Sequence, residues 1–300
     1  MKKIVLFLFI SIASFAQNGI IGDGFSTGWS NPSNVTGFDA GAGGSRIKTL
    51  NPNGTGNRYF RMVKFWDDNN SEFGPFGCSD VDWSNKSGEK YENMPICTNG
   101  AFYINCPNTT DNYVFKTPSG PSDDFVYFRV QGAVRSVSSV SQVPLVSNVV
   151  VGQDVVVTAN LDGAFSTGQA VYIRYSKDAF ATSTVTEMTG SGTTYTTTIP
   201  AAFNTANANV AYYVFTSGNG LTISGADADW FTINLNSNGG TNYNYTVSNT
   251  WTSTVGATNW SNPASWSAGS VPNTGANIVI SNSITLDVDA NVSGISIATT

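Results

Sequence analysis

Apolar and polar residues alternate in short runs along most of the chain, and clusters of Gly, Asn and Pro separate the runs. A period of two is typical of β-strands joined by turns. Between residues 17 and 132 the clearest runs are RYFRMVKFW, AFYINC, NYVFKT and DFVYFRVQG, which begin at residues 58, 101, 112 and 124. Because no stretch after residue 16 shows a convincing helical period, the pattern predicts an all-β protein whose first domain is a β-sandwich over residues 17–132.

A second and more regular set of runs occupies residues 133–248: DVVVTANL, AVYIRYSKD, TVTEMTG, TYTTTIP, NVAYYVFTSG, DWFTINLN and NYNYTV. About seven Thr- and Val-rich strands predict an immunoglobulin-like or fibronectin-III-like sandwich. Alternation in AVYIRY predicts that Val171, Ile173 and Tyr175 share one face of the sheet. Tyr172 and Arg174 then lie on the other face.

Residues 249–300 have a different pattern, TNWSNPASWSAGSVPNTGANIVISNSITLDV followed by a further short apolar run. Three brief strands at short intervals predict the first rungs of a β-solenoid, with Trp260 and Trp266 covering the first rung. Each rung of a solenoid buries its apolar face against the next rung. We therefore expect these residues to be the beginning of an incomplete solenoid in a longer chain.

The first residues, MKKIVLFLFISIASFA, have the pattern of an export signal. Lys2 and Lys3 precede an apolar run, and small residues Ser14 and Ala16 stand where signal peptidase reads the chain. The run is shorter than the roughly 20 residues that span a bilayer, and no later stretch is apolar enough. The sequence predicts a Sec signal peptide over residues 1–16, no transmembrane segment, and a secreted protein located outside the cell or on its outer surface.

Charge and composition narrow the choice of partners. The formal net charge is −6, only 11% of residues are charged, and no Lys or Arg follows Lys177. Nucleic acid is an improbable partner because its binding requires clustered cations. Histidine is absent, which removes Ser-His and Cys-His catalysis and His-ligated zinc. A surface of amide, hydroxyl and aromatic groups instead suits a neutral, hydroxyl-rich ligand such as a polysaccharide or cell-surface glycan.

Two stretches resemble known families. The Trp-rich, Val-Pro-containing segment from Thr258 resembles the opening of β-solenoid regions in large secreted and surface proteins of Bacteroidota, which are cargo of the type IX secretion system. VYIRYSKDAFATSTVTEMTGSGTTYTTTIPA and ANVAYYVFTSGN resemble the immunoglobulin-like modules attached to secreted amylases, some of which bind starch. The first resemblance implies a sorting domain further along the chain, and the second implies carbohydrate binding.

Aromatic residues are the main candidates for a glycan site, because the apolar face of a sugar ring stacks on a flat aromatic ring. Most aromatic residues of a small sandwich belong to its core. Trp230, beside Asp227 and Asp229 after a Gly-rich loop, is the best candidate of the second domain, and Tyr172 is a further one. In the first domain we expect Trp83, in the polar loop CSDVDWSNKSGEKY, to contact ligand.

Carboxylates offer two alternative chemistries. Pairs of Asp residues supply oxygen ligands of the type that Ca²⁺ prefers, although none has the full register of a calcium loop: Asp227 and Asp229, Asp80 and Asp82, Asp67 and Asp68, Asp287 and Asp289. Glu72 with Glu89 or Glu92 is the only pairing suited to glycoside hydrolysis, and no recognisable motif surrounds it. Turn and surface positions explain these carboxylates equally well, so we predict no catalysis and no cofactor, with Ca²⁺ at Asp227 and Asp229 as the alternative.

All three cysteines, Cys78, Cys97 and Cys106, lie in the first domain. In an exported protein one disulfide is expected, with one thiol left over. A bridge from Cys97 to Cys106 would close a hairpin, whereas a bridge from Cys78 to Cys97 would close the long excursion between them. The spacing does not decide between these pairings.

These observations predict a non-catalytic, secreted modular protein that is adhesin-like or glycan-binding. The alternative is the N-terminal accessory region of an extracellular hydrolase whose catalytic domain, degrading polysaccharide, protein or nucleic acid, lies beyond residue 300. Both hypotheses predict the same modules in the present residues, so the residues beyond 300 would discriminate between them.

Overall fold

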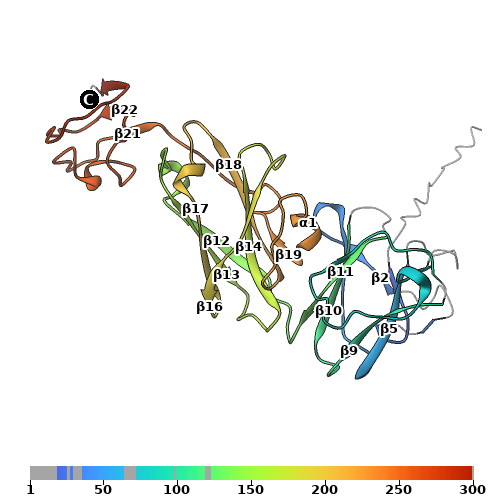
Figure 1. Cartoon of the computed structure of the whole chain (residues 1–300). Helices are drawn as coiled ribbons and strands as arrows, with labels where there is room; N and C mark the ends of the chain where they lie inside the picture. Colours follow the sequence, from blue (N-terminus) through green and yellow to red (C-terminus); the bar gives the residue numbers. More distant parts are fainter. Residues whose placement is uncertain are drawn as a thin grey trace, which may run out of the picture. The chain divides into compact units, whose positions relative to one another are not determined.

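The computed structural model describes residues 19–25, 28–29, 36–63, 72–97, 99–118 and 123–298. The predicted signal peptide and the pair Asp67 and Asp68 lie outside the described residues. The protein is all-β, as predicted, and its strands form several separate sheets with a sandwich-like arrangement (Figure 1). The chain divides into two compact units. The first comprises residues 1–40, 44–109 and 115–126, and the second comprises residues 41–43, 110–114 and 127–300.

The first sandwich pairs two sheets. One has the order β2-β1-β5-β9-β7, with β6 also on β5: Thr36–Gly37, Gly19–Ile21, Gly56–Val63, Phe102–Cys106, Val81–Asp82 and Glu72–Phe73. The other has the order β3-β4-β10-β11-β8: Asp39–Ala40, Arg46–Leu50, Asn112–Thr117, Phe125–Val130 and Lys90–Tyr91. Phe60 of β5 packs its ring against Phe115 of β10 and Phe125 of β11, with centroids 5.2 and 5.9 Å apart. Aromatic rings therefore fill the space between the sheets.

The second sandwich also has two sheets (Figure 1). The order of the first is β12-β13-β17-β16: Val137–Val143, Val155–Leu161, Thr194–Ile199 and Thr189–Ser191. The order of the second is β15-β14-β18-β19, with β20 also on β18: Thr184–Glu187, Gln169–Ser176, Asn209–Gly218, Asn234–Asn236 and Tyr243–Thr246. The inward faces meet in one core that includes Val157, Ile173 and Val214, all fully buried. Alternating β-branched residues thus supply the core expected of a sandwich.

Both faces of β14 are buried. Val171, Ile173 and Tyr175 belong to the core, as the alternation predicts. Tyr172 and Arg174, on the opposite face, are only 1% and 8% exposed. The chain that follows β18 covers them, because the Leu221 N–H donates to the Tyr172 hydroxyl and the Arg174 guanidinium lies 3.5 Å from the Asp229 carboxylate.

The prediction of one strand in the second sandwich is wrong for the first residues of that strand. The run DWFTINLN begins as a short helix, α1, Ala228–Phe231, and only its last residues form β19. The Phe231 N–H donates to the Asp227 carbonyl, and the Thr232 hydroxyl donates to the Ala228 carbonyl. The alternating pattern does not produce a strand here, because the helical turn brings Asp229 to the buried Arg174.

Residues 249–298 form a separate sheet of parallel strands, β21, β22 and β23: Thr250–Thr252, Asn277–Ile280 and Gly294–Ile297. Trp251 pairs with Ile278, which pairs in turn with Ile295. Trp260 and Trp266 are buried beside this sheet with their rings in a T-shaped contact at 4.7 Å, and the Trp266 indole N–H donates to the Trp260 carbonyl. Successive parallel strands on one sheet are the arrangement of stacked rungs.

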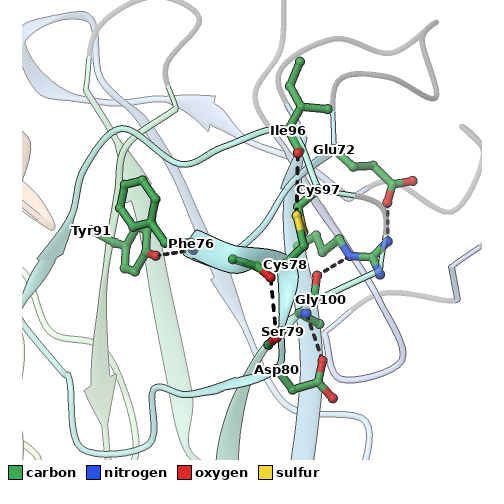
Figure 2. The surroundings of a disulfide bond; sticks show 12 residues. Glu72, Phe76, Cys78, Ser79, Asp80, Tyr91, Ile96, Cys97 and Gly100 are labelled. Carbon is green, nitrogen blue, oxygen red and sulfur yellow. Dashed lines mark hydrogen bonds and ion pairs between the residues drawn. A yellow bond between two sulfur atoms is a disulfide. The ribbon is translucent and has the colours of Figure 1, made fainter.

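A disulfide joins Cys78 to Cys97 in the first sandwich, with 5.5 Å between their Cα atoms (Figure 2). One bridge is therefore confirmed, and of the two pairings left open it closes the long excursion. Cys106 keeps its thiol, which is buried and lies 3.5 Å from the Ile104 carbonyl. A Cβ on Gly100 would lie 2.4 Å from the Cys78 carbonyl carbon, so only glycine fits beside the bridge.

Among the described residues, no helix has the length and hydropathy needed to span a bilayer.

Candidate functional site

Trp83, the ligand candidate of the first sandwich, follows β7 and is only 8% exposed. Its ring contacts the rings of Tyr91, Phe102 and Phe125 at centroid distances of 5.0, 5.8 and 6.0 Å. The side chain is therefore part of the aromatic core and leaves no open ring face for a sugar. Lys86 lies over the ring at 5.9 Å and adds to its cover.

Tyr172 is buried in the second sandwich. Its hydroxyl lies 2.9 Å from the Gly218 carbonyl and 3.1 Å from the Glu187 carboxylate, and it accepts a hydrogen bond from the Leu221 N–H. Burial raises the pKa of this phenol well above its usual range, with the Glu187 charge acting in the same direction. Tyr172 fixes the chain after β18 to the sheet, and its ring is closed to a ligand.

The helical turn α1 brings Trp230, Asp227 and Asp229 together, but it engages both carboxylates with protein groups. Asp227 accepts from the Ser224 hydroxyl at 2.8 Å. Asp229 accepts from the Tyr213 hydroxyl at 2.8 Å and lies 3.5 Å from Arg174. Trp230 is partly buried, with its ring 6.1 Å from that of Phe231.

A buried polar network stands behind this turn. The Arg174 guanidinium donates to the Tyr213 hydroxyl and to the Ser183 hydroxyl, each at 2.8 Å, and the Phe180 ring lies 5.0 Å from it. Burial raises the pKa of the Tyr213 phenol, and the nearby Arg174 acts against the rise. Partners satisfy the buried cation, so the network stabilises the sheet face rather than presenting reactive groups.

The three predicted calcium pairs that lie within the described residues do not assemble into clusters. Among the described residues, no group of at least three Asp, Glu, His or Cys side chains is placed to hold a metal ion. The Asp80 carboxylate accepts from the Ala101 N–H, and the Asp82 carboxylate accepts from the Ser84 N–H. Asp287 similarly accepts from the Ser261 N–H, next to Asp289. Asp82 thus stabilises a local turn, whereas Asp80 and Asp287 each accept from the backbone of a distant segment.

The proposed catalytic pairing of glutamates is also taken up by other contacts. Glu72 forms an ion pair with Arg61 at 2.6 Å, and Glu89 forms one with Lys86 at 2.8 Å. Glu92 is exposed. A retaining or inverting glycosidase needs one acid that protonates and one that acts as base or nucleophile, both directed at the same bond. Separate cations hold Glu72 and Glu89, which favours structural roles for both.

A groove of about 540 Å³ lies in the second unit, where the chain leaves β20 and enters β21. Its lining is rich in amide and hydroxyl groups: Ser147, Asn207, Asn244, Thr246, Ser248, Asn249, Thr250 and Asn277. Val146, at its rim, is 53% exposed. No Lys, Arg, Asp or Glu lines the groove. We call it the amide groove.

Local hydrogen bonds position the amides of this groove. The Asn277 N–H donates to the Asn249 carbonyl, and the Asn249 side-chain amide donates to the Gly275 carbonyl. Among the described residues, the side chains of Asn207, Asn244 and Asn277 make no hydrogen bond, so their amides are available to a ligand. Sequence analysis missed this groove, and the only signal was the density of Asn in NSNGGTNYNYTVSN, residues 236–249.

No protein-family model matches this chain, and no curated protein or solved structure is significantly similar to it. Evidence on function therefore comes from the chain's own residues and their geometry.

Proposed function

We propose that this chain is the non-catalytic, glycan-binding part of a secreted or cell-surface modular protein. The observation that carries the proposal is the amide groove, an uncharged recess whose wall is rich in side-chain amides and hydroxyls. Sugar hydroxyls both donate and accept hydrogen bonds, and side-chain amides and hydroxyls can do the same. The groove thus matches the hydrogen-bonding chemistry of a neutral saccharide.

Size and charge favour the same ligand. A volume of about 540 Å³ falls within the roughly 300–1,000 Å³ that is usual for small-molecule sites. An ionic ligand would meet no opposite charge in the groove, because no Lys or Arg follows Lys177 and the lining residues carry no carboxylate. The exposed Val146 at the rim offers an apolar contact for the CH face of a sugar.

The modular organisation suggests where such binding is used. Signal-like residues 1–16 and the resemblance to Bacteroidota surface proteins support export, with the type IX secretion system as the route. The parallel strands β21 to β23 support the first rungs of a solenoid as a further module. Binding modules on such a chain would hold a glycan at the cell surface, as an adhesin does, without chemical turnover.

The proposal is tested by titrating the mature chain, residues 17–300, with a panel of short neutral oligosaccharides in an isothermal calorimeter. We expect at least one to bind. We also expect the double variant Asn207→Ala with Asn244→Ala to weaken that binding roughly 30-fold, because each of the two lost hydrogen bonds is worth about 1 kcal/mol. The control variant is Asn85→Ala, an exposed asparagine of the first sandwich.

The possible outcomes test the binding site and the glycan-binding function separately. Binding that the Asn85→Ala chain keeps and the groove variant loses supports the groove as the site. Equal affinity of the groove variant and the unmodified chain would place the ligand elsewhere and remove the observation that carries the proposal. If no oligosaccharide of the panel releases or absorbs heat, the glycan-binding function itself is contradicted.

A further inference from the structure

The outer face of the sheet formed by β5 and β9 carries aromatic residues. Along β5, Tyr59 alternates with Phe60 and Met62, which are fully or almost fully buried in the core of the first sandwich. Along β9, Tyr103 alternates with Phe102 and Ile104, both 0% exposed. Successive side chains of a strand point to opposite faces. Both tyrosines are therefore on the side of the sheet that faces away from the aromatic core, and both are partly exposed.

The register of the strands joins these residues into one surface. The antiparallel pairing of β5 with β9 places Tyr59 opposite Tyr103 and Asn57 opposite Asn105. The tyrosine rings lie 5.2 Å apart and are tilted by 44°. Asn105 donates its side-chain amide to the Asn57 side-chain carbonyl at 2.9 Å. We call this set of four residues the tyrosine platform.

Contact between the two strands explains why the tyrosine rings pack together, but it gives no role to their hydroxyl groups. An aromatic pair contributes to sheet stability through its rings alone. Within the described part of the chain, neither the Tyr59 nor the Tyr103 hydroxyl makes a hydrogen bond. The hydrogen bond between the two asparagines uses the Asn105 nitrogen and the Asn57 oxygen. The Asn57 side-chain nitrogen and the Asn105 side-chain oxygen beside the tyrosines are therefore not used by it. Partly exposed rings bordered by unused donors and acceptors match the needs of a sugar, which has apolar CH faces and a polar rim.

Negative charge borders the platform at strand β7. Asp82 pairs with Tyr103 in parallel register, and Asp80 lies two residues before it. Hydrogen bonds from the Ser84 hydroxyl and N–H lower the pKa of Asp82, so its carboxylate is ionised at neutral pH. The pKa of Tyr103 is raised, first by desolvation and then by the charge of Asp82, its partner in the strand register. An anionic ligand would be repelled at this border.

The platform is extended at its other side by Arg61, two residues beyond Tyr59 on β5. The Glu72 carboxylate pairs with the Arg61 guanidinium at 2.6 Å, and the Gly100 carbonyl accepts from it at 2.7 Å (Figure 2). The partly exposed Trp29 ring lies 4.8 Å from this guanidinium. Because Glu72 neutralises its charge, Arg61 packs on the Trp29 ring and adds little attraction for an anion.

We propose that the tyrosine platform is a second glycan site, which binds an extended neutral polysaccharide by stacking sugar rings on Tyr59 and Tyr103. The side-chain amides of Asn57 and Asn105 donate to or accept from the sugar hydroxyls at the rim, and the Asp82 carboxylate accepts from them. The inference rests on the proposed glycan-binding function. It adds a site in the other compact unit and a ligand class, a flat chain of pyranoses rather than a short saccharide.

The test is retention of the mature chain on insoluble neutral polysaccharides, with an anionic polysaccharide as a parallel arm. We expect the double variant Tyr59→Ala with Tyr103→Ala to lose affinity for the retaining polysaccharide about tenfold or more, since both stacking surfaces are removed. Tyr59→Phe with Tyr103→Phe keeps both rings, and its loss should be clearly smaller. Phe76→Ala is the matched control, because Phe76 is the exposed aromatic residue of the same sandwich with 62% exposure.

A measurement on the unmodified chain covers the case in which the alanine variant does not fold. Tyrosine nitration, mapped by mass spectrometry, should fall severalfold at Tyr59 and Tyr103 when the retaining polysaccharide is present, and should stay constant at Tyr195 of the second sandwich. Undiminished nitration at the platform would overturn the inference, as would an alanine variant that is retained as well as the Phe76→Ala chain.

Preference for the anionic polysaccharide would overturn the neutral ligand class. If no neutral polysaccharide retains the unmodified chain, the platform is not a glycan site, while calorimetry with short oligosaccharides at the amide groove decides the proposed function separately. Failure of the inference and failure of the proposed function are thus distinguished by different ligands and different variants.

Discussion

Tyr213→Phe removes a single hydroxyl from the buried network of the second sandwich, and its effect on stability can be worked out from the structure. The hydroxyl accepts from the Arg174 guanidinium at 2.8 Å and donates to the Asp229 carboxylate at 2.8 Å. The side chain of Arg174 is 10% exposed, whereas that of Asp229 is 42% exposed. Phenylalanine keeps the ring contacts, so the substitution isolates the two hydrogen bonds.

The two bonds contribute unequally. A hydrogen bond to a charged group is worth about 1.5–3 kcal/mol when the group is buried. Water can replace the hydroxyl at the half-exposed Asp229, so that bond adds little. Arg174 keeps Ser183 at 2.8 Å and Asp229 at 3.5 Å, but it loses its buried neutral acceptor. We therefore expect a loss of about 1.5–3 kcal/mol in total, which raises the local opening constant roughly 10- to 100-fold.

Hydrogen exchange of the full chain, followed by mass spectrometry on peptides from β14 and β18, measures this opening. Tyr195→Phe is the matched control: Tyr195 belongs to the same sandwich and packs on Phe165 at 5.1 Å. No described residue hydrogen-bonds to its hydroxyl. If the two variants differ by less than about 0.5 kcal/mol, the buried cation does not depend on Tyr213 and the reasoning is refuted.

Two further predictions concern the cysteines and an aspartate. Alkylation of the denatured, unreduced protein should label Cys106 alone, and its digest should contain a Cys78–Cys97 peptide; a Cys97–Cys106 peptide or triple labelling would contradict the structure. Hydrogen bonds from Ser176 and Thr182 lower the pKa of Asp178 from 3.8 to about 2. Since the folded-state pKa is depressed, this carboxylate stabilises the fold above about pH 4 and loses that effect as the pH falls towards 2. Ser176→Ala should raise the midpoint of the Asp178 carboxyl titration in NMR, and an unchanged midpoint would rule out the hydroxyl as its cause.

The sequence predicted most of the second sandwich, because alternation reports burial wherever one face of a strand meets a core. Val171, Ile173 and Tyr175 are in the core for this reason. Alternation did not reveal that the opposite face, with Tyr172 and Arg174, is also buried, since that cover comes from the chain after β18. The contact of Asp229 with Arg174 likewise accompanies a helical turn, α1, where the pattern predicts the start of a strand.

The candidate sites were harder to predict because exposure depends on contacts between distant residues. Trp83 lies in a polar loop sequence, yet its ring joins the aromatic core. Tyr59 and Tyr103 stand in strands that the pattern does predict, but only their register across the sheet makes them a pair. The amide groove likewise needs residues from strands separated along the chain. The choice of Cys78 and Cys97 required a Cα distance that spacing does not supply.

The edge of strand β23 affects how copies of this chain interact in concentrated solution. One of its edges pairs with β22, and the other meets no strand among the described residues. Ile295 and Ile297 along it are 59% and 76% exposed. Unpaired edges with apolar side chains template pairing between molecules. We therefore expect copies of this chain to associate through the free edge of β23 as their concentration rises.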